Sequence, residues 1–386
     1  MFKNVKLKKI LKNTIFKAFN IVNPLIKKRD NIILIYQGNR GLAGNNLPLY
    51  DYLIKNEYND KYRIVCSVEN MPVGNTNLKN VRFVNHLGGI FTFFRAKHVY
   101  YTAGQIPIKP SKKQIVIHMQ HGTTDLKTVG ALSKINNGNE FYFTYMMCPS
   151  DLYVDIVIKS YLCKKENVLV CGEPMTDVLV NGQYERYGLN QERINILWAP
   201  TFKQSDYYGY AQNESSAPLL PCFNNTDYNE LNEVLRNNNM HLYVKLHPGQ
   251  SLKDYDNILL SNLEVYSNDD FNKKWKLYDF MMQCPVLLGD YSSVMLQSLL
   301  CDRKLVFVIP DIEEYKNNRG FAFENPENYM PGYIVKSKRD LYIALEEMAA
   351  GIDKYKDERK RILDLVHKYK DGKNCQRTLE FSGIKK

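Results

Sequence analysis

Two histidines and a pair of serines are the residues whose types and positions most suggest chemistry. His121 and His247 carry imidazoles, which exchange protons near neutral pH. Ser292 and Ser293 place hydroxyls where a helix is expected to begin, and the backbone N–H groups of a helix start suit a phosphate. An imidazole together with a phosphate site predicts group transfer from a nucleotide donor.

Short apolar runs, typical of buried parallel strands, precede each of these residues. The carboxyl ends of parallel strands meet at one edge of a sheet, where α/β proteins bind ligands. We therefore expect the polar segments after the runs to lie along such edges. The apolar runs are 114–119 before His121, 194–198 before the polar segment 199–203, 242–246 before His247, and 286–288 before Ser292.

Length and composition indicate a globular protein of about two domains, at roughly 150 residues per domain. The chain has 386 residues, of which 44% are hydrophobic, and its net charge of +11 favours anionic partners such as nucleotides, polyphosphates or a membrane surface. Nucleic-acid binding is not expected, because zinc-finger spacing, RNA-binding aromatic signatures and dense basic runs are absent from the sequence. Eight cysteines without a Cys-x-x-Cys pair are typical of reduced cytosolic thiols.

Residues 1–28 form a segment unlike the rest of the chain. Apolar residues recur at near-helical spacing from Phe2 to Phe19, with lysines between them, so a basic amphipathic helix is expected. Lys12 and Lys17 interrupt every apolar stretch, which argues against a secretory signal, and no window approaches the roughly 20 apolar residues of a spanning helix. We expect this helix to lie on anionic lipid; the alternative is that it packs on its own domain.

Strands alternating with helices predict parallel sheets covered on both faces. One series of apolar runs extends from residue 31 to residue 171 and a second from 194 to 335. We therefore predict an α/β fold of two doubly wound, Rossmann-like domains facing a cleft, preceded by the amphipathic helix. The expected domains are 1–28, 29–187 and 188–386.

Six ordered motifs carry a resemblance to a known family. They are His121-Gly122-Thr123 with Leu126-Lys127, the segment from Gly172 to Asp177, the segment 199–203, His247-Pro248, Asp290-Tyr291-Ser292-Ser293, and the segment 319–323 followed by Pro331-Gly332. On these motifs the chain resembles the CDP-glycerol glycerophosphotransferases of teichoic acid and capsule synthesis, which have a GT-B-like fold. Two departures, Met175-Thr176 for Arg-Asn and Leu296-Gln297 for Phe-Asp, leave the choice of phospho-alcohol open.

The resemblance implies an enzyme that moves glycerol phosphate from CDP-glycerol, or ribitol phosphate from CDP-ribitol, to a hydroxyl of a lipid-linked saccharide or growing polymer, releasing CMP. It implies His121 as the general base and His247 as the residue that stabilises charge on the pyrophosphate. Domain 29–187 would bind the acceptor and domain 188–386 the donor. The expected donor contacts are Thr201, Lys203, Lys245, Asp290, Ser292, Ser293 and Arg319. Gly122, Thr123, Lys127 and Asp177 are expected on the acceptor side or in structural roles.

A site of this kind needs no metal and no tightly bound cofactor. A loosely bound Mg2+ and the oligomeric state both stay open. His118 precedes His121 by three residues, so the pleat turns it to the opposite face and a packed core histidine is expected. The expected location is peripheral, on the cytoplasmic face of the plasma membrane, and priming or short extension is favoured over long polymerisation.

Two other functions remain open. A GT-B glycosyltransferase acting in cell-envelope polysaccharide synthesis would share the architecture, and the glycine-rich segment 38–44 resembles in outline the glycine-rich loop of its first domain. A scaffold that binds polymer or lipid without catalysis would keep the fold, but intact His121, His247 and Ser292 argue against it.

Overall fold

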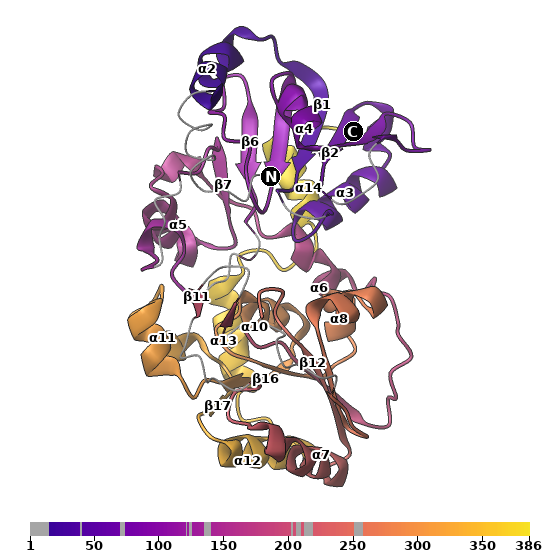
Figure 1. The fold of residues 1–386 in the computed structure, drawn as a ribbon, viewed down its shortest axis with the longest axis vertical. Helices are drawn as coiled ribbons and strands as arrows, with labels where there is room; N and C mark the ends of the chain where they lie inside the picture. The colour runs from indigo at the N-terminus through magenta and orange to yellow at the C-terminus, as the bar shows by residue number, and fades with distance from the viewer. Residues whose placement is uncertain are drawn as a thin grey trace. The chain divides into compact units, whose positions relative to one another are not determined.

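Two series of β-strands alternating with helices make up the chain, as Figure 1 shows for the computed structural model. The structure describes residues 15–38, 41–69, 74–120, 122, 126–134, 140–201, 204–205, 210–211, 219–250 and 258–386. Contacts divide the chain into two units. Unit 1 comprises Met1–Thr123, Gly138–Asp177 and Lys373–Lys386, and unit 2 comprises Thr124–Asn137 and Val178–Gly372.

The sheet of unit 1 is parallel except for the short edge strand β3, which runs antiparallel to β4. Its described strands lie in the order β3 (Gly74–Asn75), β4 (Val81–Val84), β2 (Arg63–Ser67), β1 (Arg29–Tyr36), β5 (Ala96–Tyr101), β6 (Ile115–His118), β7 (Tyr145–Cys148) and β8 (Val168–Val170). The described α-helices of this unit are α2 (Ile15–Val22), α3 (Asn46–Lys55), α4 (His86–Phe93), α5 (Val154–Tyr161) and α14 (Asn374–Phe381).

Alternate residues of β1 face two separate hydrophobic cores. Ile33 and Ile35 pack in one core with residues of α3 and α14, and Leu34 packs in the other with residues of α4. Because side chains alternate along a strand, helices therefore cover both faces of the sheet. This is the doubly wound arrangement that the continuous apolar run predicts.

The sheet of unit 2 is also parallel apart from one short edge strand, β13. Its described strands lie in the order β13 (Ile258–Leu259), β14 (Leu263–Tyr266), β12 (Met240–Lys245), β9 (Ile194–Trp198), β15 (Val286–Gly289), β16 (Lys304–Val308) and β17 (Tyr333–Val335). A separate hairpin pairs β10 (Gln204–Ser205) with β11 (Tyr210–Ala211). The described helices are α7 (Tyr228–Asn237), α8 (Asn268–Lys274), α9 (Leu277–Met281), α10 (Ser293–Gln297), α11 (Ile312–Asn318), α12 (Lys338–Ala349) and α13 (Lys356–Val366), with α6 (Asp177–Asn181) beginning at the end of unit 1.

Three segments lie in a different unit from the one expected from the domain boundaries 29–187 and 188–386. Residues 178–187 belong to unit 2, and so do 124–137, whereas 373–386 return to unit 1 as α14. The prediction of two doubly wound α/β domains is confirmed. The eight cysteines are free thiols, and Cys66, Cys148, Cys171, Cys284 and Cys375 are buried.

The described part of the amphipathic segment packs on unit 1. Phe16 and Phe19 on α2 lie against the core beneath α4, and the rings of Phe19 and Phe94 meet edge to face with centroids 5.3 Å apart. Lys28 is buried and donates from Nζ to the backbone oxygen of Asn23 at 2.8 Å and to that of Phe94 at 2.6 Å. The segment is therefore anchored to its own domain from residue 16 to residue 28; residues 1–14 lie outside the described part.

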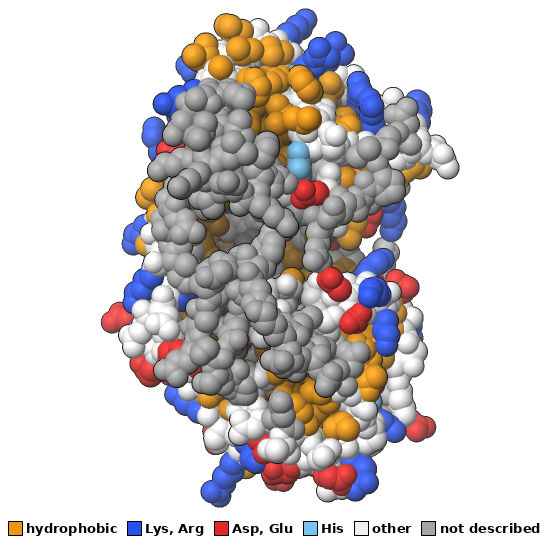
Figure 2. Space-filling model, in the orientation of Figure 1, with side chains coloured by type: hydrophobic (Ala, Val, Ile, Leu, Met, Phe, Trp, Pro, Cys, Tyr) orange, Lys and Arg blue, Asp and Glu red, His pale blue; other side chains and the backbone are white. Residues whose placement is uncertain are grey.

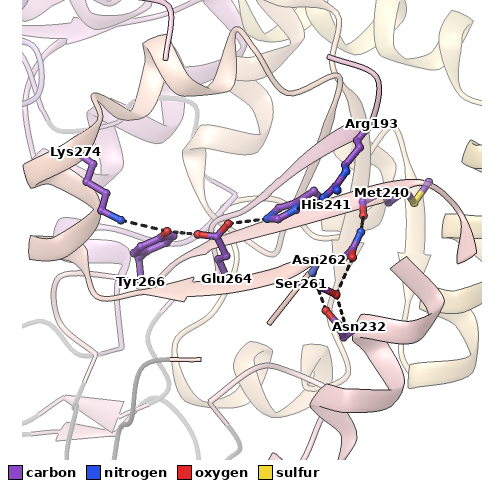
Figure 3. A network of polar contacts seen from close by, with 9 residues as sticks. All are labelled: Arg193, Asn232, Met240, His241, Ser261, Asn262, Glu264, Tyr266 and Lys274. Carbon is purple, nitrogen blue, oxygen red and sulfur yellow. Dashed lines mark hydrogen bonds and ion pairs between the residues drawn. The ribbon is translucent and has the colours of Figure 1, made fainter. Parts of the chain in front are cut away.

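A network of polar side chains joins two strands of unit 2 to α8 (Figure 3). His241 on β12 contacts Glu264 on β14, with Nε2 and Oε1 2.8 Å apart, and Arg193 lies on the other side of the imidazole. Tyr266 donates to the same carboxylate, and Lys274 on α8 donates to the hydroxyl of Tyr266. The hydrogen bond from His241 is the largest of the interactions that lower the pKa of Glu264. These contacts give the network a structural role, in which it joins the neighbouring strands β12 and β14 to α8.

None of the helices in the described ranges combines the length and apolar character needed to cross a membrane.

Candidate active site

The second sheet reverses its strand order between β9 and β15. From β9 the chain proceeds to β12 and β14 on one side, and β15 and β16 then occupy the other side. In doubly wound sheets the crevice at such a switch point is where ligands bind. The segments that leave the carboxyl ends of β9 and β15 contain Thr201 and Asp290, two of the expected donor contacts.

Thr201 and Asp290 are joined by two hydrogen bonds. Oδ2 of Asp290 accepts from the backbone N–H of Thr201 at 2.8 Å and from its hydroxyl at 2.7 Å. Both residues are buried, and Asp290 is 1% exposed. Oδ1 of Asp290 has no hydrogen-bond partner in the described structure. One carboxylate oxygen therefore fixes the turn, and the other is left to accept a hydrogen bond from a ligand.

The serines lie directly after this aspartate. Ser292 occupies the N-cap position of α10 with an extended backbone, and its side chain makes no capping hydrogen bond. Tyr291 between them is buried, donates to Asp311 Oδ1 at 3.1 Å and packs on the Tyr315 ring, with centroids 4.3 Å apart. The buried tyrosine anchors the turn, so the hydroxyl of Ser292 is not required to hold the helix start. Burial also raises the pKa of Tyr291 far above its ordinary value, which keeps it neutral.

Lys245 and His247 follow the end of β12. Lys245 is buried, and its Nζ donates to Oδ1 of Asn268 at the start of α8 at 2.8 Å; burial lowers the pKa of Lys245 to about 8. His247 is half-buried, and its Nδ1 accepts from the backbone N–H of Gly249 at 2.9 Å. In the neutral ring the proton is then on Nε2, which can donate to a phosphate oxygen. The expected role of His247 is compatible with this tautomer, whereas Lys245 ties β12 to α8.

Two of the sequence motifs pair with each other in unit 2. Lys127 and Phe321 form an antiparallel bridge, and Ala322 donates from its backbone N–H to the oxygen of Leu126 at 2.8 Å. Thr128 donates from its hydroxyl to the backbone oxygen of Arg319 at 2.7 Å. The Nε atom of Arg319 is buried without a hydrogen-bond partner among the described residues, which suits a contact with an anionic ligand. The chain that follows His121 is thus fastened next to an expected donor contact.

The residues before His121 are held by three side chains that lie outside the six motifs named above. Gln120 is buried with a positive φ of 56°; its Nε2 donates to the Met147 oxygen at 2.9 Å, and its Oε1 accepts from the Tyr161 hydroxyl at 3.0 Å. Asn45 is buried and donates to the Met119 oxygen at 2.8 Å. These bonds fix the end of β6 where the chain turns toward the expected base.

Three expected site residues, His121, Thr123 and Lys203, lie outside the described residues. Gly122 is described and has a φ of 155°, a conformation that favours glycine. His118 is buried, stacks on Tyr101 with ring centroids 4.4 Å apart, and its Nε2 lies 3.2 Å from the oxygen of Thr102. His118 is therefore a packed histidine with a fixed tautomer, as expected.

Asp177 serves the fold of unit 1. Its Oδ1 accepts from the backbone N–H of Asn374 at 2.9 Å, and its Oδ2 accepts from that of Cys375 at 2.8 Å. These N–H groups begin α14, so the carboxylate caps a helix that is distant in sequence. Burial raises the pKa of Asp177, and the two backbone hydrogen bonds oppose that effect.

No group of three or more His, Cys, Asp or Glu side chains is placed to hold a metal ion within the part of the chain that the structure describes.

Comparison with known proteins decides the family. The model of the CDP-glycerol:poly(glycerophosphate) glycerophosphotransferases matches residues 15–381. The chain belongs to this family. The expectation of a transferase of this kind is confirmed.

Relatives in teichoic acid synthesis cover most of the chain. The teichoic acid ribitol-phosphate polymerase TarK of Staphylococcus aureus is 24% identical over 385 residues, covering 95% of this chain and 71% of that protein. A teichoic acid poly(glycerol phosphate) polymerase of Bacillus spizizenii is 23% identical and covers 86% of each. The solved structure of the wall teichoic acid polymerase TagF superposes with a TM-score of 0.74 at 19% identity, covering 99% of this chain and 95% of that one. The GT-B-like fold expected from the sequence is confirmed.

Proposed function

We propose that the protein transfers a polyol phosphate from a CDP-activated donor, CDP-glycerol or CDP-ribitol, to a hydroxyl of an acceptor in teichoic acid synthesis. The acceptor oxygen attacks the β-phosphorus, the bond between that phosphorus and the oxygen of CMP breaks, and a phosphodiester forms. The proposal rests on the hydrogen-bonded pair Thr201 and Asp290, which lies at the switch point of the sheet of unit 2. It also rests on the family to which the chain belongs.

Six other expected site residues have roles in this mechanism. His121 takes the proton of the attacking hydroxyl, since a neutral imidazole is the usual base at neutral pH. His247 donates from Nε2 to the pyrophosphate, which is supported by the hydrogen bond that Nδ1 accepts from Gly249. Ser292 contributes a hydroxyl to the phosphate. The other donor contacts are Lys203, Ser293 and Arg319, of which Arg319 has the buried, unpartnered Nε.

The proposed acceptor is lipid-linked, and the protein lies on the cytoplasmic face of the membrane. An apolar surface at the α2 and α4 end of unit 1 supports this; Figure 2 shows hydrophobic side chains gathered there with Lys and Arg around them. The exposed apolar side chains on these two helices and in the turn after α2 are Ile21, Val22, Leu25, Leu87 and Phe91, and Leu25 is 81% exposed. Exposed apolar residues rimmed by basic ones suit an anionic lipid surface. The membrane contact proposed here thus extends beyond residues 1–28.

Liposome co-sedimentation tests the membrane contact. Removal of residues 1–14, rather than 1–28, leaves Asn23 and Lys28 in place and so keeps the anchoring of α2. Replacing Leu25 and Phe91 together by Ser should reduce sedimentation with anionic liposomes at low salt. Leu162, 81% exposed on the same unit, gives a matched control when replaced by Ser. Equal loss in both variants would overturn the proposed surface.

Mass spectrometry of reaction products tests the activity. The purified protein is incubated with a lipid-linked disaccharide and either CDP-glycerol, CDP-ribitol or a UDP-sugar. We expect mass increments of glycerol phosphate or ribitol phosphate, with release of CMP, and the number of increments separates priming from polymerisation. Turnover with the UDP-sugar alone would refute the proposal in favour of a glycosyltransferase. Adding a chelator to the same reaction decides whether Mg2+ is needed.

A further inference from the structure

A second group of polar side chains lies at the carboxyl edge of the sheet of unit 1. Tyr36 is the last residue of β1, Glu69 follows β2 by two residues, and His86 is the first residue of α4, which follows β4. The strands β4, β2 and β1 are neighbours in the sheet. None of the three side chains has a part in the donor site or in the proposed proton transfer.

The hydroxyl of Tyr36 is a buried polar group. The side chain is 1% exposed, and the hydroxyl has no hydrogen-bond partner among the described residues. Buried polar groups are nearly always hydrogen-bonded, so an exception at the ligand-binding edge of a sheet points to a partner that arrives with a ligand. Burial, and then the charge of Glu69, raise the pKa of Tyr36, so its hydroxyl stays protonated and can donate.

His86 lies against the ring of Tyr36, and Glu69 lies next to His86. The rings of Tyr36 and His86 have centroids 5.5 Å apart, and Nε2 of His86 lies 3.7 Å from Oε2 of Glu69. Both ring nitrogens of His86 are buried and make no hydrogen bond to a described residue. The side chain of Glu69 is 37% exposed and that of His86 is 14% exposed, so solvent reaches the group on the side of the carboxylate. A donor hydroxyl, an imidazole and a carboxylate together match hydroxyl groups of a ligand, whereas the carboxylate disfavours a phosphate.

The helix that begins at His86 also carries exposed apolar side chains. Leu87 is 67% exposed and Phe91, one turn later, is 71% exposed. Residues four apart lie on the same side of a helix, so these two form one apolar surface next to the polar group. A ligand that carries both hydroxyl groups and a hydrocarbon chain can contact both surfaces.

We propose that Tyr36, Glu69 and His86 bind hydroxyl groups of the saccharide or polyol part of a lipid-linked acceptor, with Leu87 and Phe91 against its hydrocarbon. This rests on the proposed function, because it names the part of unit 1 that holds the acceptor. The reaction at the donor site does not depend on these residues.

Tyr36→Phe gives the sharpest test, because it removes one oxygen and no described hydrogen bond. A structural role predicts an unchanged or higher Tm, since a buried unpaired group is lost. The binding role predicts in addition that KM for a lipid-linked disaccharide acceptor rises about fivefold to tenfold, the value of one hydrogen bond. KM for CDP-glycerol should change less than about twofold. Glu69→Gln and His86→Ala should raise KM for the same acceptor.

Tyr100→Phe is the matched control in the neighbouring strand β5. The hydroxyl of Tyr100 is buried and bonded to Ser382, so its removal should lower Tm and leave KM for the acceptor unchanged. If the wild type turns over CDP-glycerol and the acceptor KM of Tyr36→Phe is unchanged, the proposed acceptor site is overturned. The proposed function is not affected by that result. Absence of any transfer by the wild type from CDP-glycerol and CDP-ribitol would instead overturn the proposed function.

Discussion

Removing the carboxylate of Asp290 should uncouple the turn after β9 from the turn after β15. Asp290→Ala deprives Thr201 of the acceptor for its buried backbone N–H and for its hydroxyl. An unpaired buried donor costs about 1–3 kcal/mol and a hydrogen bond to a charged group about 1.5–3 kcal/mol, so a loss of about 3 kcal/mol in the free energy of unfolding is expected. Thr201→Val removes only the hydroxyl at constant shape and should cost about 1.5–2 kcal/mol.

A double-mutant cycle measured by urea unfolding isolates this contact. The combined variant should show a coupling energy of about 1.5 kcal/mol between residues 201 and 290. Thr102→Val provides the control, because its buried hydroxyl bonds to Gln37 in the other unit and should be additive with Asp290→Ala within about 0.5 kcal/mol. KM for CDP-glycerol should rise in both single variants as the turn loosens. A coupling energy below about 0.5 kcal/mol between 201 and 290 would refute the assignment of Asp290 as the residue that joins the two turns.

Three further predictions test other parts of the structure. His121→Ala should lower the transfer rate by about 10²–10⁴ without changing Tm, as loss of a general base does, and a folded variant with full turnover would contradict the role of His121. Asp177→Ala should lower the free energy of unfolding by about 2–3 kcal/mol in urea titrations, because two N–H groups of α14 lose their acceptor, and an unchanged midpoint would contradict the capping role. Burial lowers the pKa of His98 and of His367 from 6.5 to about 4, so the unfolded chain binds protons that the native protein does not. The stability should therefore fall as the pH drops from about 7 to about 4, by about 2 kcal/mol per histidine at pH 5, and His367→Gln should remove about half of the loss.

Apolar runs predicted most of the central strands because a buried parallel strand is apolar on both faces. The run expected at 242–246 and the observed β12 differ by two residues at the start and one at the end, and the run at 194–198 coincides with β9. Apolar runs give no comparable signal for α4. Its sequence contains Gly88 and Gly89, which disfavour a helix, and the helix forms because Asn85 accepts from the Gly88 N–H at 3.0 Å and the apolar face packs on the sheet.

Some residues of the candidate site could also be predicted from the sequence, and others could not. Thr201, Asp290 and Ser292 could be selected because each follows an apolar run, and the order of strands then placed two of these runs side by side. Asn45, Gln120 and Tyr161 act through long-range hydrogen bonds, with partners that are separated by 27 to 74 residues in the sequence. No local pattern marks a buried glutamine that holds a loop, so such residues become visible only in the folded structure.

The return of α14 to unit 1 has a consequence for the order in which the protein folds as it is synthesised. Asp177 and Asn374, which meet at the cap, are 197 residues apart, and all of unit 2 except the segment 124–137 is translated between them. At about 5–20 residues per second, a nascent unit 1 would wait roughly 10–40 s with part of one core uncovered. Unit 2, which has its own core, can become compact in that interval. Ribosome-bound chains that end before residue 373 should therefore hold a more protease-sensitive unit 1 than unit 2, and chaperone binding should be concentrated on the surface that α14 later covers.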